Sequence, residues 1–179
     1  VLRAVRVALE AGCGPVQVWS AARGGHRFLQ GLAARCDGVL HHQRHGDLGL
    51  RMGAALDHAL RAGHPAALLI GTDTVELTPA DLRAAAQVLR DGADAVLHPA
   101  ADGGYVLLGT RRPLQSLLGG VHWSSGQEFV QTCTRLRRRG WRLAVQSVRA
   151  DIDDPRDLRR ARRGGWSARQ ELAHAAPPS

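Results

Sequence analysis

Asp73 is the first residue whose position suggests chemistry. It follows the apolar run of residues 66–70, which is typical of a strand buried on both faces. In open α/β sheets, ligands bind beyond the carboxyl ends of the strands, where Asp73 would lie. The next helix does not need this acid, because Thr78 supplies an N-cap and Pro79 fits the first helical position. An ordinary turn residue is the alternative.

A second group of acids lies in the segment DIDDPRDL, residues 151–158. Asp154 is a natural N-cap, and Asp157 suits the positive end of the following helix. Asp151 and Asp153 have no such structural explanation, and strand alternation would place both on one side of an extended segment. Acids from two strand ends, with positions left for water and phosphate, suit Mg²⁺ or Mn²⁺ better than zinc.

Two glycine-containing segments can admit a ligand close to the backbone. Asp102 precedes Gly103 and Gly104, which allow either a tight hairpin turn or the close approach of a ligand. The segment GDLGLRM, residues 46–52, would open a helix whose free N–H groups can receive a phosphate, with Arg51 adding a charged fork. The alternative is an ordinary N-capped helix start that binds no phosphate, which explains the same residues.

The other polar features do not indicate a further kind of site. His41, His42 and His45 lack a fourth ligand at zinc-site spacing, so we interpret them as a polar loop after a strand. The net charge of +8 arises late in the chain: residues 1–134 hold 12 Arg against 11 acids, and residues 135–179 hold 12 Arg against 5 acids. Because only Trp141 and Trp166 stand among these arginines, the segment lacks the series of interleaved aromatic residues of a base-stacking platform. We therefore interpret the arginines as a solvated face and do not expect nucleic acid as a partner.

The elements that would position these residues alternate along the chain. Helical periodicity predicts a first helix in residues 1–12, and apolar runs predict strands near 15–21, 38–42, 66–72 and 93–99 with a helix between successive strands. The Asp-Gly-Gly turn predicts a strand that returns antiparallel, followed by a helix capped at Ser124 or Ser125. A strand in residues 141–148 and a helix in residues 153–163 follow.

This order predicts an α/β fold of three layers, with a mainly parallel mixed sheet flanked by helices. We expect one domain in residues 1–162 and a loosely ordered tail in residues 163–179. No apolar run approaches the ~20 residues of a membrane-spanning helix. The sequence therefore favours a cytoplasmic protein without a membrane span.

Several motifs occur in an order that resembles a known family. They are GTD after an apolar strand, HPAADGGYVLLG, WSS and DIDDPRDL, with DLGLRM upstream. The ordered set is similar to the bacterial glycosyltransferase-like family called the radical-SAM/selenodomain-associated transferases, over most of residues 1–162. The resemblance implies the GT-A fold of nucleotide-diphospho-sugar transferases, which is related to nucleotidyltransferases of the molybdenum-cofactor guanylyltransferase type.

The resemblance also implies an activity and a set of site residues. It implies a divalent-metal-dependent transferase with a nucleotide-activated donor, such as a nucleotide sugar. The activity it favours is that of a glycosyltransferase acting on a small acceptor. Asp73 and Asp153 would hold Mg²⁺ or Mn²⁺, with Asp151 as the alternative second ligand, and Asp102 would be the base on the acceptor side. The residues expected to contact the nucleotide are Gly49, Arg51, Gly71, Thr72, Gly103 and Gly104. A nucleotidyltransferase of the same fold and a degenerate, non-catalytic binding domain are the alternatives.

The sequence departs from the family pattern in three places. Thr74 and Val75 stand where the family usually has Cys-Pro or a similar pair, and Ala101 replaces the usual Glu before Asp-Gly-Gly. The family's opening strand and its K-x-P-x-x-G-x-x-K-T-R-L loop do not precede the first helix. We therefore expect a fold that lacks the usual first strand, with exposed strand edges through which two copies could pair.

Overall fold

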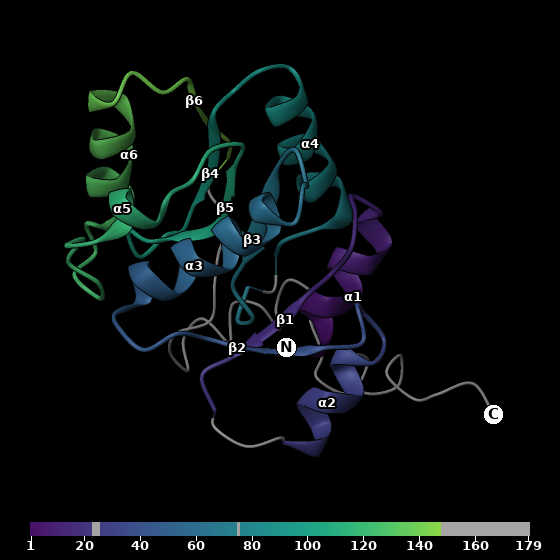
Figure 1. The fold of residues 1–179 in the computed structure, drawn as a ribbon. Coiled ribbons are helices and arrows are strands. Elements are labelled where there is room, and N and C mark those ends of the chain that lie inside the picture. The colour runs from purple at the N-terminus through teal and green to yellow at the C-terminus, as the bar shows by residue number, and fades with distance from the viewer. Residues whose placement is uncertain (23–25, 75, 148–179) are drawn as a thin grey trace.

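The computed structural model describes residues 1–22, 26–74 and 76–147, which form a mixed α/β fold (Figure 1). The helices are α1 (Leu2–Ala11), α2 (Arg27–Ala33), α3 (Leu48–Arg61), α4 (Pro79–Arg90), α5 (Gln115–Leu118) and α6 (Glu128–Arg138). The strands are β1 (Val18–Ser20), β2 (Leu40–His42), β3 (Ala67–Ile70), β4 (Ala95–Pro99), β5 (Tyr105–Thr110) and β6 (Leu143–Val145). The predicted fold class is confirmed, since helices flank a sheet on both faces.

The main sheet has four strands in the order β3-β5-β4-β6. β5 runs antiparallel to β3 and β4, whereas β4 and β6 are parallel, so the returning strand predicted after the Asp-Gly-Gly turn is confirmed. Leu107 of β5 lies beside Ile70 of β3 and His98 of β4. The ends of β3 and β4 and the start of β5 therefore meet at one edge of the sheet, which we call the carboxyl edge.

β1 and β2 form a separate parallel sheet of two strands. In the described part of the chain, β1 is not hydrogen-bonded to β3, and each of these strands has one unpaired edge. α1 packs on both sheets, because Val7 belongs to an apolar cluster of the main sheet while Val5 packs with the cluster of the small sheet. A ring contact between Trp19 of β1 and His58 of α3, 5.4 Å between centroids, also joins the small sheet to the rest. Pairing of two copies through the open edges stays a prediction.

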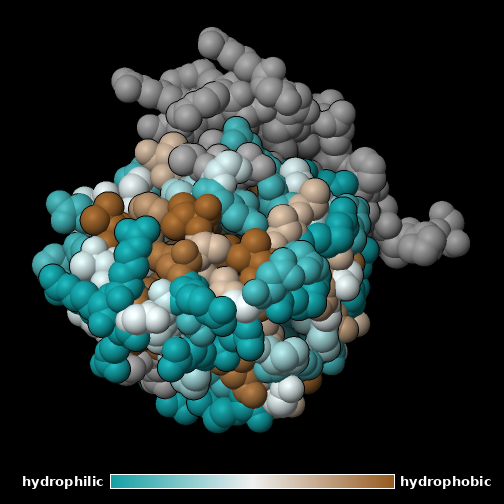
Figure 2. Space-filling view, turned by 90° about the horizontal axis from the view of Figure 1, so that it is seen from above, coloured by the Kyte–Doolittle hydropathy of each residue, from teal (hydrophilic) through white to brown (hydrophobic). Residues whose placement is uncertain are grey.

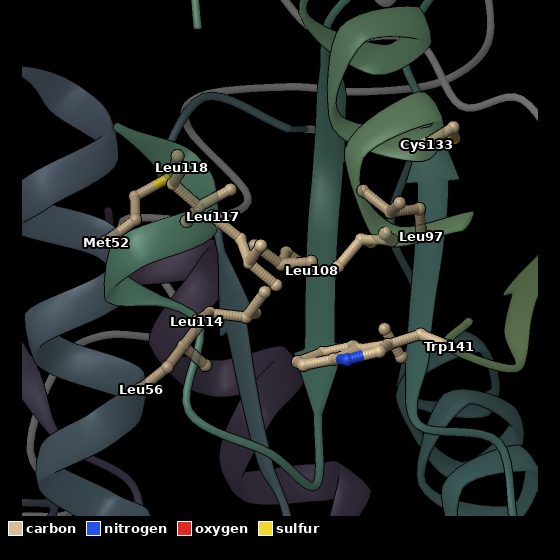
Figure 3. Packing of buried hydrophobic residues seen from close by; sticks show 11 residues of the cluster. Met52, Leu56, Leu97, Leu108, Leu114, Leu117, Leu118, Cys133 and Trp141 are labelled. Atoms are coloured by element: carbon tan, nitrogen blue, oxygen red, sulfur yellow. The ribbon is translucent and has the colours of Figure 1, made fainter. Parts of the chain in front are cut away.

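Two apolar clusters hold the three layers together. Leu97 of β4 and Leu108 of β5 pack on the face covered by α3, α5 and α6, and the ring of Trp141 lies across the same cluster (Figure 3). Val96 and Leu107, the alternate residues of these strands, pack on the face covered by α1 and α4. Both central strands are thus buried on both faces, and each fully buried leucine stabilises the fold by roughly 1.5–3 kcal/mol.

The helix ends follow from short polar signals. α4 begins with a capping box, in which the Thr78 hydroxyl accepts from the Asp81 N–H and the Asp81 carboxylate accepts from the Thr78 N–H. Asp47 caps α3 by accepting from the N–H of Leu50 at 2.8 Å. Gly12 ends α1 in the left-handed conformation. No helix in residues 1–22, 26–74 or 76–147 is long and apolar enough to cross a membrane. The predicted last helix and the tail lie outside the described residues.

Candidate active site

Asp73 lies just beyond the end of β3, at the carboxyl edge. Gly71 continues the pairing of β3 by donating its N–H to the Val106 carbonyl at 3.1 Å. The Asp73 carboxylate folds back over Gly71, where a Cβ would lie 2.7 Å from Oδ1, so a side chain at position 71 would displace it. Asp73 is exposed, and within the described residues its carboxylate has no hydrogen-bond or ion-pair partner. Since Thr78 and Asp81 already cap α4, the acid is available to bind a ligand.

Thr74 beside it was not predicted as a site residue. It is 4% exposed, and its Oγ1 has no hydrogen-bond partner among the described residues. A buried hydroxyl without a partner costs about 1–3 kcal/mol. The sequence showed Thr74 only as a departure from the family pattern, because nothing local indicates that a threonine in a loop will be buried.

The Asp102-Gly103-Gly104 turn also lies at the carboxyl edge. The Asp102 carboxylate is exposed, and its Oδ1 accepts from the Gly104 N–H at 2.8 Å. Gly103 has φ +94°, and a Cβ there would collide with the carbonyl oxygen of Gly126. The Gly103 carbonyl accepts from the N–H of Phe129 at 3.0 Å. The turn prediction is therefore confirmed, whereas the space beside Gly103 is filled by the backbone of Gly126, so the close approach of a ligand to this glycine stays a prediction.

That backbone belongs to the loop before α6. The predicted cap at Ser124 or Ser125 is wrong, because α6 begins at Glu128 after Gln127, which makes no side-chain cap. Glu128 instead reaches back, and its Oε1 accepts from the Ser125 N–H at 2.6 Å. Glu128 is 6% exposed, and Ser124 adopts φ +60°. The tertiary contact with Gly103 sets this loop, and the sequence around it does not reveal that contact.

The start of α3 reaches the same part of the fold. The Arg51 guanidinium donates to the Gln43 side-chain oxygen at 3.2 Å and to the Asp47 carbonyl at 3.4 Å. Gly49 is buried against the Leu118 carbonyl and the Trp123 ring, so protein atoms occupy the space beside its Cα. A nucleotide contact by Gly49 stays a prediction, and the structure gives this glycine a packing role.

Trp123 and Tyr105 join α3 to the start of β5. Their rings meet edge to face with centroids 6.3 Å apart. Burial raises the pKa of the Tyr105 phenol, with nearby Glu128 adding to the effect and Thr132 opposing it. Tyr105 therefore keeps its proton at neutral pH and anchors the turn rather than acting as a base. These contacts connect Gly49, through Trp123 and Tyr105, to the start of β5.

The structure does not place every predicted ligand. Asp151 and Asp153 lie outside the described residues, so their approach to Asp73 stays a prediction. Over the described ranges, no group of three or more His, Cys, Asp or Glu side chains is arranged to hold a metal ion. His41 is paired with Asp37 at 2.7 Å and stacks on Trp19, which is consistent with a structural role.

Comparison with solved structures supports the fold. A proposed nucleotide-diphospho-sugar transferase from Desulfovibrio desulfuricans G20 is similar with a TM-score of 0.76 and 22% identity, over 92% of this chain and 75% of that chain. Rv0371c from Mycobacterium tuberculosis H37Rv is similar with a TM-score of 0.54 and 21% identity, over 89% of this chain and 81% of that chain. At these identities the likeness is one of fold.

Comparison of sequences identifies the family. No curated protein matches the chain. Residues 4–125, which include the end of β3 and the Asp-Gly-Gly turn, match the model of DUF2064. The chain therefore belongs to DUF2064, a family of uncharacterized proteins conserved in bacteria.

Proposed function

We propose that this protein is a divalent-metal-dependent transferase that uses a nucleotide-activated donor, and we favour a nucleotide sugar as that donor. The observation that carries the proposal is Asp73, an exposed carboxylate without a partner in the described chain, at the carboxyl end of a strand in the main sheet. Ligands of open α/β sheets bind at this edge. The fold is similar to that of a proposed nucleotide-diphospho-sugar transferase, which supports the choice of donor.

The chemistry of the residues at the carboxyl edge fits Mg²⁺ or Mn²⁺. Both ions prefer oxygen ligands and keep open positions for water and phosphate oxygens. Asp73 offers an exposed carboxylate, while the Thr74 hydroxyl beside it is buried and could reach a ligand only after a local movement of the loop. Asp153, or Asp151 in its place, would supply the second carboxylate. A cation bound here would offset the charge that builds on the leaving diphosphate.

The start of α3 would bind the donor's phosphates. Arg51 is held by Gln43 and Asp47, and a guanidinium that is already oriented loses less side-chain entropy when it binds an anion. Gly71 and Thr72 would bring backbone groups close to the same phosphates. The missing side chain at Gly71 also leaves room for the Asp73 carboxylate.

The Asp-Gly-Gly turn would form the acceptor side. Asp102 is exposed, and the Gly104 N–H fixes one of its oxygens, which leaves the other free to accept a proton from an acceptor hydroxyl. Gly103 holds this geometry through its contact with Gly126, and Gly104 leaves room for the Asp102 carboxylate. Asp73 and Asp102 thus serve the two halves of one site.

Calorimetric titration of UDP and GDP, with and without Mn²⁺, tests the proposal. We expect metal-dependent binding, and Asp73→Asn should weaken it by more than about tenfold. Mutating a residue that only hydrogen-bonds to a metal ligand already lowers metal affinity by about tenfold or more, so losing a direct ligand should cost at least as much. Asp91→Asn is the matched control, because Asp91 is an exposed acid at the opposite end of the sheet. Unchanged metal-dependent binding by Asp73→Asn would remove the basis of the proposal.

The reaction products separate the remaining alternatives. Sugar transfer from a nucleotide sugar releases a nucleoside diphosphate, whereas nucleotidyl transfer from a nucleoside triphosphate releases pyrophosphate. If the protein is a glycosyltransferase, incubation with a panel of nucleotide sugars and Mn²⁺ should release a nucleoside diphosphate. Binding of UDP or GDP without turnover of any nucleotide sugar would instead indicate a non-catalytic binding domain.

A further inference from the structure

Exposed arginines gather at the end of the molecule opposite the carboxyl edge. They come from the end of α4, the turn after β5, the end of α6 and the residue before β6. We call this surface the basic end, and its exposed arginines are Arg90, Arg111, Arg112, Arg137, Arg138, Arg139 and Arg142.

The topology brings these segments together. α4 and α6 each lead directly into a strand, and β4 and β6 are parallel, so both helices finish where these strands start. Two hydrogen bonds tie the turns to each other: the Asp94 N–H donates to the Arg142 carbonyl at 2.8 Å, and the Arg111 N–H donates to the Asp94 carbonyl at 3.0 Å. In Figure 1 these ends of α4, β4, α6 and β6 lie at the top.

The acids at the basic end are already engaged and do not balance its charge. Asp94 accepts from the Arg142 N–H at 2.8 Å and lies 3.8 Å from the Arg112 guanidinium. Asp91 accepts from the Gln87 side chain at 2.7 Å. Within the described chain, the run of three arginines at residues 137–139 has no ion-pair partner. The helix dipole favours a cation in the last turn of α4 or α6, but it does not account for the arginines beyond the helix ends.

Apolar surface lies among these charges. Leu117 lines a shallow hollow of about 240 Å³ together with Arg135, Arg138 and Arg139. Figure 2, which looks down on this end, shows hydrophobic residues near the middle of the face with hydrophilic residues around them. Trp141 is 9% exposed, and the Arg112 guanidinium lies 5.0 Å from its ring centroid. The ring is therefore covered and cannot act as an exposed platform for stacking a base.

We propose that the basic end docks on an anionic phospholipid membrane surface. Arginine forks bind phosphate oxygens in pairs, and clustered cations are attracted to an anionic leaflet without needing a groove of matching shape. Leu117 is 8% exposed and Trp141 is 9% exposed, so we expect the arginines, rather than insertion of apolar side chains, to carry the docking. A single-stranded nucleic acid would instead need exposed aromatic rings, which the described part of the basic end does not offer.

Docking in this way has a consequence for the candidate active site. The carboxyl edge lies at the other end of the main sheet, so it would face away from the membrane and stay open to water. The docking surface shares no residue with the candidate active site. Its test therefore does not depend on the transferase proposal.

Flotation of the full chain with lipid vesicles tests the proposal. We expect binding to phosphatidylcholine vesicles that contain phosphatidylglycerol, no binding to pure phosphatidylcholine, and a decline as salt is raised. The triple variant Arg137→Gln/Arg138→Gln/Arg139→Gln should bind roughly a hundredfold more weakly, because each arginine near an anionic surface contributes roughly a factor of five.

A second triple variant with the same net charge tests whether binding depends on the arginines of the basic end or only on the total charge of the protein. Arg27→Gln/Arg44→Gln/Arg83→Gln removes three exposed arginines that lie on α2, after β2 and near the start of α4. We expect this variant to bind anionic vesicles like the parent chain, and circular dichroism should show both variants folded. Equal loss in the two variants, or equal binding to neutral and anionic vesicles, would overturn the proposal. It would also be overturned if duplex DNA bound the basic end more tightly than anionic vesicles in the same buffer.

Discussion

Replacing Gly103 by alanine should destabilise the protein more than its backbone conformation alone explains. Gly103 has φ +94°, and in the left-handed region a side chain costs roughly 1–2 kcal/mol. The new Cβ would also collide with the Gly126 carbonyl, a backbone atom that no rotamer change can move. Forcing an extra carbon into a packed site costs about 1–3 kcal/mol, so we expect a total loss of about 2–5 kcal/mol.

Two other glycines separate the components of this loss. Gly140 has φ +71°, and no atom of the described chain lies within 4 Å of the place a Cβ would take, so Gly140→Ala should lose only the roughly 1–2 kcal/mol of backbone strain. Gly119 has φ −62° and similar open space around it, so Gly119→Ala should change stability by less than about 0.5 kcal/mol. Urea unfolding followed by tryptophan fluorescence measures all three variants. If Gly103→Ala lost no more stability than Gly140→Ala, the Asp-Gly-Gly turn would not be docked on the loop before α6.

Three further outcomes follow from the described contacts. Thr78→Ala should lower the free energy of unfolding by about 0.5–2 kcal/mol in a urea titration, because it removes half of the capping box of α4; no loss would mean that the box is absent in solution. Leu108→Ala should cost about 2–5 kcal/mol because Leu108 is 0% exposed, whereas Val130→Ala, at 63% exposure, should cost almost nothing; similar losses would contradict the core. Cys13 is exposed and should react first with a thiol reagent near neutral pH. Burial raises the pKa of the Cys133 thiol, so less of it is thiolate near neutral pH than for an exposed cysteine, and it should react only on unfolding. Equal reaction rates for Cys13 and Cys133 would contradict the burial of Cys133.

The parts of the fold that the sequence predicted are those set by local signals. The Thr78 cap and the alternation of apolar runs with periodic segments predicted most of the helices and strands. The Asp-Gly-Gly turn predicted the antiparallel return at β5, because a tight turn leaves no room for a crossover helix. The four-residue helix α5 was not predicted, since so short a segment has too few residues to show helical periodicity.

The candidate site was predicted only where local sequence patterns place its residues. Asp73 and Asp102 follow recognisable strand and turn patterns, and both lie at the carboxyl edge. The burial of Thr74 and the packing of Gly49 against Trp123 depend on segments far apart in the chain, so no local pattern could show them. The cap expected at Ser124 or Ser125 failed because Glu128 binds the Ser125 N–H while Gly126 packs on Gly103.

The central claim is that Asp73 binds the divalent cation that serves a nucleotide diphosphate. The most direct measurement is a crystal structure of the full chain with Mn²⁺ and UDP or GDP, in which the anomalous signal of manganese locates the ion. The proposal predicts manganese bonded to the Asp73 carboxylate and to a diphosphate oxygen at the carboxyl edge. A nucleotide bound with its manganese away from Asp73 would contradict it.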